Sequence, residues 1–341
     1  MVEKKSLRYG TTIILFILLV FLLFFLYFFE LPRREKEKKI KGESQRLLAL
    51  DEGNFQRLTI LKGERRIVLS RGNNDDAWFI EQPISDKADS GEISSLISYL
   101  GSFKFDRIVE ENSGNLKKYG LDAPELSVQL DIRGQASKTM KVGRRSPIGE
   151  GRYLAVEGDP RIYLVHGSLV FRLDRDSDHF RDKNAFDIVF ESVKCFVLQR
   201  SGETIKLERN LTEWEVTAPD KSSADREKVE NMLRRICSLW IEAFHEVNPS
   251  DLSVYGLEEP VARVSLRTDE GEQTLLLGNE RKEAGSDREF VYAKRAERPG
   301  VFSVRRSILD DLNFKAQDFI KSPSSTENLP VKSSMEMEKK Q

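Results

Sequence analysis

The sequence predicts an α+β protein in which a single N-terminal transmembrane helix precedes two tandem, duplicated, mainly antiparallel β domains, each with one main packing helix. Three observations predict this arrangement. Residues 11–29 carry no charged side chain. Motifs in the rest of the chain recur at a nearly constant spacing. Each copy contains several short strand patterns but one longer amphipathic helix pattern, whose apolar stripe is Ile93, Leu96, Ile97 and Leu100 in the first copy and Val229, Met232, Leu233 and Ile236 in the second.

The composition limits the classes of function. The chain has 341 residues, with 55 Lys and Arg against 56 Asp and Glu, which suits about two domains and gives no charge-based case for a nucleic-acid partner. Its 2 Cys and 3 His are too few for a disulfide scaffold or a four-cysteine zinc site. We therefore predict no cofactor, no metal site and no catalytic residues.

Residues 11–29 (TTIILFILLVFLLFFLYFF) predict the membrane anchor. As a helix they would be about 28 Å long, close to the thickness of a bilayer core. The apolar run is longer than that of a signal peptide, and no small-x-small cleavage site follows it. We therefore expect a short tail over 1–10, an uncleaved span in the lipid bilayer, and a charged stalk over 30–53.

The charges around this span bear on its orientation. Lys4, Lys5 and Arg8 precede it, and six basic residues follow between positions 33 and 41. Taken alone, the positive-inside rule weakly favours a cytoplasmic body.

An internal duplication sets the domain boundaries. The segments Trp78…Pro83, Ala88-Asp89 and Tyr119-Gly120-Leu121…Pro124 recur 136 residues later as Trp214…Pro219, Ala224-Asp225 and Tyr255-Gly256-Leu257…Pro260. Further along, Leu154-Ala155 is paired with Tyr292-Ala293. We predict one α+β repeat over 54–188, a second over 192–320, and a disordered polar tail over 321–341.

Each repeat has the same predicted order of elements. Asp89 and Asp225 are expected to cap the main helix, and Glu92 to complete a capping box with Asp89. A short helix near 168–172 or 307–312 closes each repeat. Strands are expected over 55–61, 66–70, 78–80, 126–132, 137–142, 153–156 and 162–165, and over 193–199, 204–208, 214–216, 262–267, 273–277, 290–294 and 301–304.

The repeated Tyr-Gly-Leu-x-x-Pro loop is the sharpest candidate site. A functional interpretation makes it a recognition loop of Tyr119, Gly120, Leu121 and Pro124, and of Tyr255, Gly256, Leu257 and Pro260. A structural interpretation is simpler and is the one we favour. Glycine permits a positive φ, proline keeps the residue before it extended, and the Tyr and Leu side chains pack inward.

Two other groups were weighed. Asp174-x-Asp176-x-Asp178 resembles the start of a calcium loop, but His179 and Ala185 stand where glycine and glutamate are needed, so a surface loop is expected. Cys195 and Cys237 are expected to be buried thiols, with a disulfide between them as an open alternative.

The anchor and the duplicated motifs together resemble a bacterial family of membrane-anchored proteins called domain of unknown function 4340 (DUF4340), here in two tandem copies. The resemblance implies an inner-membrane protein with a periplasmic or otherwise extracytoplasmic body, a topology that long domains allow largely regardless of charge. Members are often encoded beside ABC transporter components, including proteins resembling gliding-motility auxiliaries.

The expected function is therefore a non-catalytic accessory or binding subunit of a transporter-like membrane complex. The alternatives are a self-assembling envelope spacer and an envelope hydrolase that brings carboxylates together across the two copies.

Overall fold

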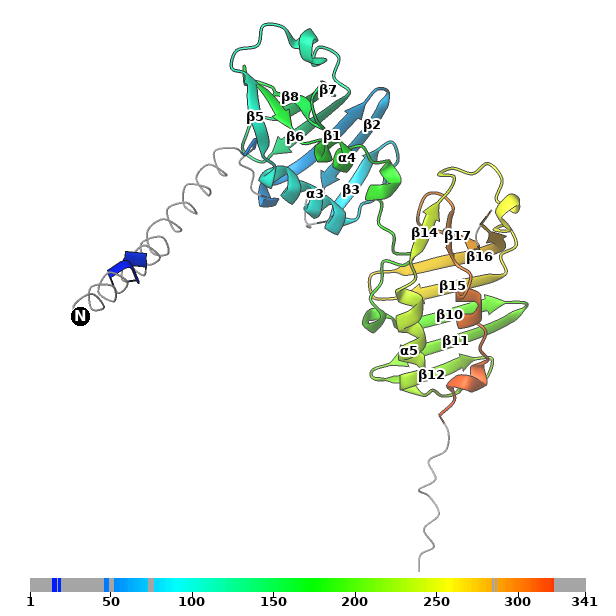
Figure 1. Cartoon of the computed structure of the whole chain (residues 1–341). Helices are drawn as coiled ribbons and strands as arrows, with labels where there is room; N and C mark the ends of the chain where they lie inside the picture. Colours follow the sequence, from blue (N-terminus) through cyan, green and yellow to red (C-terminus); the bar gives the residue numbers. More distant parts are fainter. Residues whose placement is uncertain are drawn as a thin grey trace, which may run out of the picture. The chain divides into compact units, whose positions relative to one another are not determined.

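The computed structural model describes residues 14–16, 18–19, 46–48, 52–72, 77–283, 285 and 287–321. It divides the chain into two compact units, residues 1–181 and 182–341 (Figure 1). Each unit is α+β and contains one nine-stranded antiparallel sheet, so the predicted fold class of the two repeats is confirmed. The predicted tail over 1–10, all but Lys321 of the predicted tail over 321–341, and residues 30–45 and 49–51 of the predicted stalk lie outside the described residues.

The predicted membrane segment 11–29 lies mostly outside the described residues as well. Its described residues, 14–16 and 18–19, are helical and exposed. Among all the residues that are described, no helix combines the length and apolar character needed to cross a bilayer.

The first unit places its strands in the order β4-β3-β2-β1-β6-β7-β8-β9-β5. Helix α3 (Ser90–Ser102) leads from β4 at one edge of the sheet to β5 at the other, and α4 (Ser168–Leu173) follows β9. The strands are β1 (Phe55–Lys62), β2 (Arg65–Arg71), β3 (Trp78–Gln82), β4 (Asp86–Lys87), β5 (Phe105–Glu110), β6 (Leu126–Ile132), β7 (Lys138–Arg145), β8 (Arg152–Val156) and β9 (Ile162–Val165).

The second unit repeats this topology as β13-β12-β11-β10-β15-β16-β17-β18-β14. Helix α5 (Arg226–Cys237) again joins the two sheet edges, and α6 (Ile308–Asp311) follows the last strand. The strands are β10 (Cys195–Arg200), β11 (Glu203–Asn210), β12 (Glu213–Ala218), β13 (Ser222–Ser223), β14 (Ile241–Phe244), β15 (Ala262–Arg267), β16 (Glu272–Lys282), β17 (Glu289–Arg295) and β18 (Phe302–Arg305).

The main core of each unit lies between the sheet and its helix. The predicted stripe Ile93, Leu96, Ile97 and Leu100 is buried against the first sheet. Its counterpart, Val229, Met232, Leu233 and Ile236, is buried against the second. The buried tryptophans of β3 and β12 belong to these two cores, so they pack as the duplication predicted.

The edge strands β5 and β14 were not predicted. In β5 the side chains are exposed or only half-buried along the whole strand. Such a strand shows no alternating apolar pattern in the sequence. Its place in the sheet depends on its backbone pairing with β9 instead. The same explanation covers β14, which pairs with β18.

Both units begin earlier than the sequence suggested. Leu48, expected in the charged stalk, is 2% exposed and belongs to the first core. The Leu47 N–H donates to the Phe103 carbonyl, and the Ala185 N–H donates to the Leu239 carbonyl in the same way. The stalk prediction was therefore wrong for residues 46–48, and 182–188 packs with the second unit. These short straps carry too few residues to show a period.

Two local predictions were also wrong. Asp89 caps α3 by accepting from the Gly91 and Glu92 N–H groups, but its own N–H donates to Phe180 rather than to Glu92. The predicted capping box is therefore half formed, and the Glu92 carboxylate lies 3.5 Å from His179 instead. In addition, Tyr292 corresponds to Tyr153 rather than to Leu154, because these two tyrosines contact the motif tyrosines of their units.

Candidate functional site

The Tyr-Gly-Leu loop of the first unit lies against the sheet face away from α3. The Tyr119 hydroxyl donates to Glu110 Oε2 at 2.8 Å, and its ring meets the Tyr153 ring edge-on at 4.8 Å. Tyr119, Leu121 and Ile162 are buried together as a small separate cluster. Because Tyr153 and Leu154 point to opposite faces of β8, this cluster covers the side that the helix leaves open.

Two glycines let the loop approach the sheet. A Cβ atom at Gly143 would lie 2.3 Å from the Tyr119 carbonyl oxygen, and one at Gly278 would lie 2.1 Å from that of Tyr255. Gly120 and Gly256 both have a φ of 68°, the left-handed conformation that favours glycine. Pro124 and Pro260 are half-buried and come just before β6 and β15.

The loop of the second unit is built alike but is more open. Tyr255 is half-buried, its hydroxyl donates to Glu246 Oε2 at 3.1 Å, and its ring meets Tyr292 at 5.0 Å. Burial and the bond to Glu246 raise the pKa of Tyr255. Leu257 is 3% exposed. The motif tyrosines thus make the same internal contacts in both units.

The aspartate run after α4 is neutralised by neighbouring cations. Asp174 forms ion pairs with Lys62 and Arg65, and Asp176 pairs with Arg65 at 2.6 Å. These contacts hold the run against the β1–β2 hairpin. Within the described ranges, no group of three or more His, Cys, Asp or Glu side chains is placed to hold a metal ion.

Sequence reasoning missed a Ser-His contact at the start of α4. The Ser168 Oγ lies 2.9 Å from His166 Nδ1 and 3.0 Å from the Tyr99 hydroxyl. The Ser168 N–H also donates to His166 Nδ1. These bonds fasten α4 to α3, and only the tertiary structure brings Tyr99 to the pair.

The two cysteines are unpaired thiols on opposite faces of the second sheet. Cys195 precedes the core residue Phe196 in β10 and therefore faces away from α5, whereas Cys237 ends α5 beside the main core. Burial, with the nearby charge of Glu191, raises the pKa of the Cys237 thiol to about 12. The open disulfide alternative is thus not realised in the structure.

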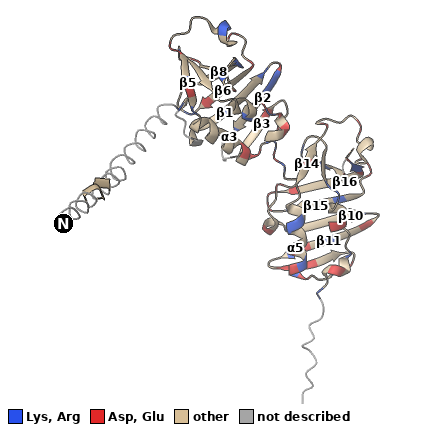
Figure 2. Cartoon of the chain, viewed as in Figure 1, with Lys and Arg blue, Asp and Glu red and all other residues tan. Residues whose placement is uncertain are grey.

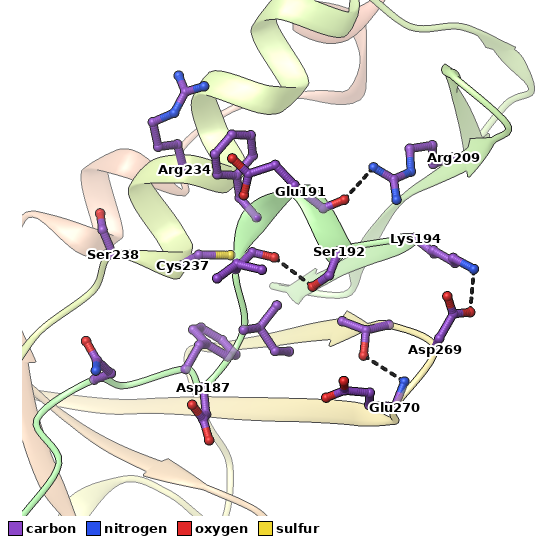
Figure 3. A pocket seen from close by; sticks show the side chains of 16 residues that line it. Asp187, Glu191, Ser192, Lys194, Arg209, Arg234, Cys237, Ser238, Asp269 and Glu270 are labelled. Atoms are coloured by element: carbon purple, nitrogen blue, oxygen red, sulfur yellow. Dashed lines mark hydrogen bonds and ion pairs between the residues drawn. The ribbon is translucent and has the colours of Figure 1, made fainter. Parts of the chain in front are cut away.

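A groove of about 700 Å³ lies in the second unit. It is lined by segment 184–192, the end of α5 and the turn 268–270. Figure 3 shows Lys194 and Arg209 on one side of it and Arg234 and Cys237 on the other. Ile188 and Phe190 are half-buried there. Val189 is 69% exposed.

The charges of the groove are partly engaged. The Arg234 guanidinium lies 4.4 Å from the centre of the Phe190 ring, and Lys194 pairs with Asp269. The Arg209 Nη1 group donates to the Glu191 carbonyl at 2.7 Å. The groove thus joins an apolar floor to a rim carrying both signs of charge.

One groove contact is repeated in the first unit, but most of the lining is not. Arg71 donates to the Gly53 carbonyl as Arg209 does to Glu191, which fixes the correspondence between the units. The counterparts of three groove residues differ in chemistry: Phe190 corresponds to Glu52, Arg234 to Ser98, and Asp269 to Arg133. The side chains that line the groove therefore differ in chemistry from their counterparts in the first unit at these three positions.

Comparison with known proteins identifies the repeated unit. A family described as Domain of unknown function (DUF4340) matches residues 78–221 and 214–323, more than half of the chain. The chain belongs to the DUF4340 family. The two DUF4340 matches begin at Trp78 and Trp214, the same position of the duplicated fold, which confirms the predicted tandem arrangement. No curated protein and no solved structure matches this DUF4340 chain.

Proposed function

We propose that this protein is a non-catalytic, membrane-anchored binding subunit of a transporter-like membrane complex, and that the groove of the second unit receives a segment of its partner. The observation that carries the proposal is that the aromatic and cationic lining of the groove, Phe190 and Arg234, is replaced by Glu52 and Ser98 in the first unit. Duplicated units share what the fold needs, so a hollow that only one of them lines with aromatic and cationic side chains serves something other than folding.

The lining suits an extended peptide segment. Half-buried Ile188 and Phe190 and exposed Val189 offer apolar contact, and Arg234 above the Phe190 ring adds a cation at its edge. Interface centres commonly combine aromatic and arginine side chains in this way. The uncharged residues 11–29 supply the proposed attachment to the inner membrane, with an extracytoplasmic body as the family resemblance implies.

The test is in-cell crosslinking of the full chain, extraction in mild detergent and identification of partners by mass spectrometry. The variant Val189→Asp with Phe190→Glu places the first unit's own residues, Asp51 and Glu52, in the groove. The control is Val261→Glu, which also introduces a residue of the first unit, Glu125, at an exposed position of the second. Val261 is 48% accessible.

We expect the wild type and the Val261 variant to recover a polytopic membrane protein and its ATPase, and the groove variant to lose at least about tenfold of that recovery. Recovery of the bait alone from every strain would contradict the proposal and favour the self-assembling spacer. Equal recovery by the wild type, the groove variant and the Val261 variant would show that the partner binds at a surface other than the groove.

A further inference from the structure

Four basic side chains of the first unit gather where two distant segments meet. Lys117 and Lys118 lie in the 3-10 turn Leu116–Tyr119, and Arg144 and Arg145 end β7. A Cβ atom at Gly120 would lie 3.1 Å from the Arg144 backbone nitrogen, so the turn and the strand end are in contact. All four side chains are exposed. We call these four residues the basic rim.

Lys118 in the basic rim is attracted by groups of its own unit: its ammonium lies 5.0 Å from the centre of the Tyr119 ring, and Tyr119, followed by the charge of Glu110, raises the pKa of Lys118. Within the described part of the chain, no Asp or Glu side chain lies within ion-pair distance of any of its four members, whereas neighbouring Arg152 pairs with Glu125. The four positive charges therefore stay exposed, without an ion pair inside the unit, and are available to an external anion.

Apolar side chains stand beside the basic rim. Ile148, at the tip of the β7–β8 hairpin that continues from Arg145, is 81% exposed, and Leu116 in the turn is 39% exposed. A surface that offers cations together with isolated protruding aliphatic groups matches the boundary between lipid headgroups and acyl chains.

The second unit has the same backbone here but not the charge. Its counterparts of Lys117, Lys118, Arg144 and Arg145 are Ser253, Val254, Asn279 and Glu280. Glu280 pairs with Arg306 at 3.2 Å. Figure 2 draws the turn blue in the first unit and tan in the second. The fold therefore does not require the rim.

We propose that the basic rim of the first unit, with Ile148 and Leu116, binds the anionic lipid headgroups of the membrane that holds residues 11–29. The inference rests on the proposed membrane anchor. Residues 30–45 between that segment and the first unit reach at most about 55 Å when extended, so the unit stays close to the bilayer and meets lipid at a high effective concentration. Tethering is the reason to choose lipid over a dissolved polyanion.

The test uses the full chain in nanodiscs, compared by hydrogen exchange and mass spectrometry. One set of discs contains only phosphatidylcholine, and the other contains about 30 mol% phosphatidylglycerol. We expect amides of 112–125 and 143–151 to exchange at least about tenfold more slowly in the anionic discs. The counterpart loops, 248–261 and 278–288, should exchange equally in both.

Three variants sharpen the readout. Replacing the four rim residues by Gln should abolish the difference between the discs. Replacing Lys221, Arg226, Arg263 and Lys282 by Gln removes the same charge from the second unit and should preserve it. Ser253→Lys with Val254→Lys and Asn279→Arg should confer lipid-dependent protection on the second unit. Exchange elsewhere in the chain reports whether each variant is folded.

The outcomes separate this inference from the anchoring on which it rests. Incorporation into both kinds of disc without a lipid-dependent difference at the rim would overturn the inference and leave the anchor standing. Failure of the chain to enter discs of either composition would overturn both. Protection of the rim by soluble polyphosphate but not by anionic discs would assign the surface to a dissolved anion and overturn the lipid proposal.

Discussion

The two units differ most clearly where the end of each unit packs beside its short edge strand. In the first unit, Arg181 Nε donates to Asp86 Oδ2 at 2.7 Å, and both side chains are almost completely buried. The same positions in the second unit hold Ile320 and Ser222, which follow from the matching bridges to Ala88 and Ala224. One backbone thus accepts either a buried ion pair or two uncharged side chains, as expected when desolvation offsets much of the attraction between charges.

The start of the main helix shows the same freedom. In the first unit, the Glu92 carboxylate lies 3.5 Å from His179. In the second, Lys228 replaces Glu92, Asp318 replaces His179, and the Lys228 ammonium donates to the Asp318 carbonyl. Backbone contacts stayed fixed while side-chain charge changed sign. The comparison teaches that the shared interior defines the fold, whereas charges are free to differ and to acquire separate functions.

The largest expected effect comes from splitting the buried pair. Asp86→Ser alone removes the 2.7 Å partner of the buried Arg181 and leaves Asp178, at 3.3 Å, as a weaker one, so it should destabilise the first unit by about 3 kcal/mol. Asp86→Ser with Arg181→Ile imitates the second unit and should recover most of that loss. Urea unfolding followed by hydrogen exchange, resolved for each unit, measures both. A double variant as unstable as the single one would show that the units are not interchangeable here.

Crowding at the motif loop should have the next largest effect. Gly143→Ala and Gly278→Ala push a methyl group against a tyrosine carbonyl, so each should cost its own unit about 1–3 kcal/mol or more. Gly114→Ala is the control, since a Cβ atom there meets nothing within 4 Å. The same unfolding measurement applies. A loss confined to one unit would mean that the loop is part of the scaffold in that unit only.

A smaller effect is expected at alkaline pH, and one part of it belongs to Tyr163 of the first unit. The Tyr163 hydroxyl donates to Asp159 Oδ2 at 2.6 Å, and burial followed by this bond raises the pKa of Tyr163 to about 12. Phe302 takes its place in the second unit. The stabilisation is complete below the ordinary tyrosine pKa of about 10 and is lost as the pH rises toward 12.

Tyr163→Phe should remove this loss and cost about 1.5 kcal/mol at neutral pH. Urea unfolding followed by circular dichroism, at pH values on both sides of 10, measures how the free energy of unfolding of the wild type and of the variant depends on pH. If wild type and variant weaken equally with pH, another group is responsible.

The smallest expected effect is that of a reducing agent. Cys195 and Cys237 are thiols on opposite faces of the second sheet, so dithiothreitol should shift the stability of that unit by less than about 0.5 kcal/mol. Alkylation of the unfolded, unreduced protein should label both residues. Blocked thiols that become available only after reduction would contradict the structure.

Much of the fold was predictable because the duplication shows the pattern of most helices and strands twice in the sequence. The stripe beginning at Ile93 and that beginning at Val229 predicted the packing helix, and Asp89 and Asp225 cap it as expected. The edge strands β5 and β14 could not be predicted: β5 has only exposed or half-buried side chains and β14 has a single buried one, Ile241, so neither shows a period. The straps at Leu48 and Ala185 escaped notice for the same reason.

The candidate sites were less predictable than the fold. The repeated motif pointed to Tyr119 and Tyr255, whose hydroxyls donate to Glu110 and Glu246 of their own units. It passed over the groove around Phe190 and the basic rim, because their residues are not repeated and come from segments far apart in the sequence. A difference between aligned copies, such as Lys118 against Val254, was the available indicator.

By itself the sequence determined the tandem DUF4340 architecture, the capped main helices and the glycine turns, since these depend on local periodicity and on backbone conformations that few residues adopt. The tertiary structure alone decided the order of the sheet, the edge strands, the place of Cys195 and Cys237, and the surfaces where groove and rim form. Those features depend on which distant segments pair, and side chains gain a common environment only when the backbone hydrogen bonds of the whole sheet are made.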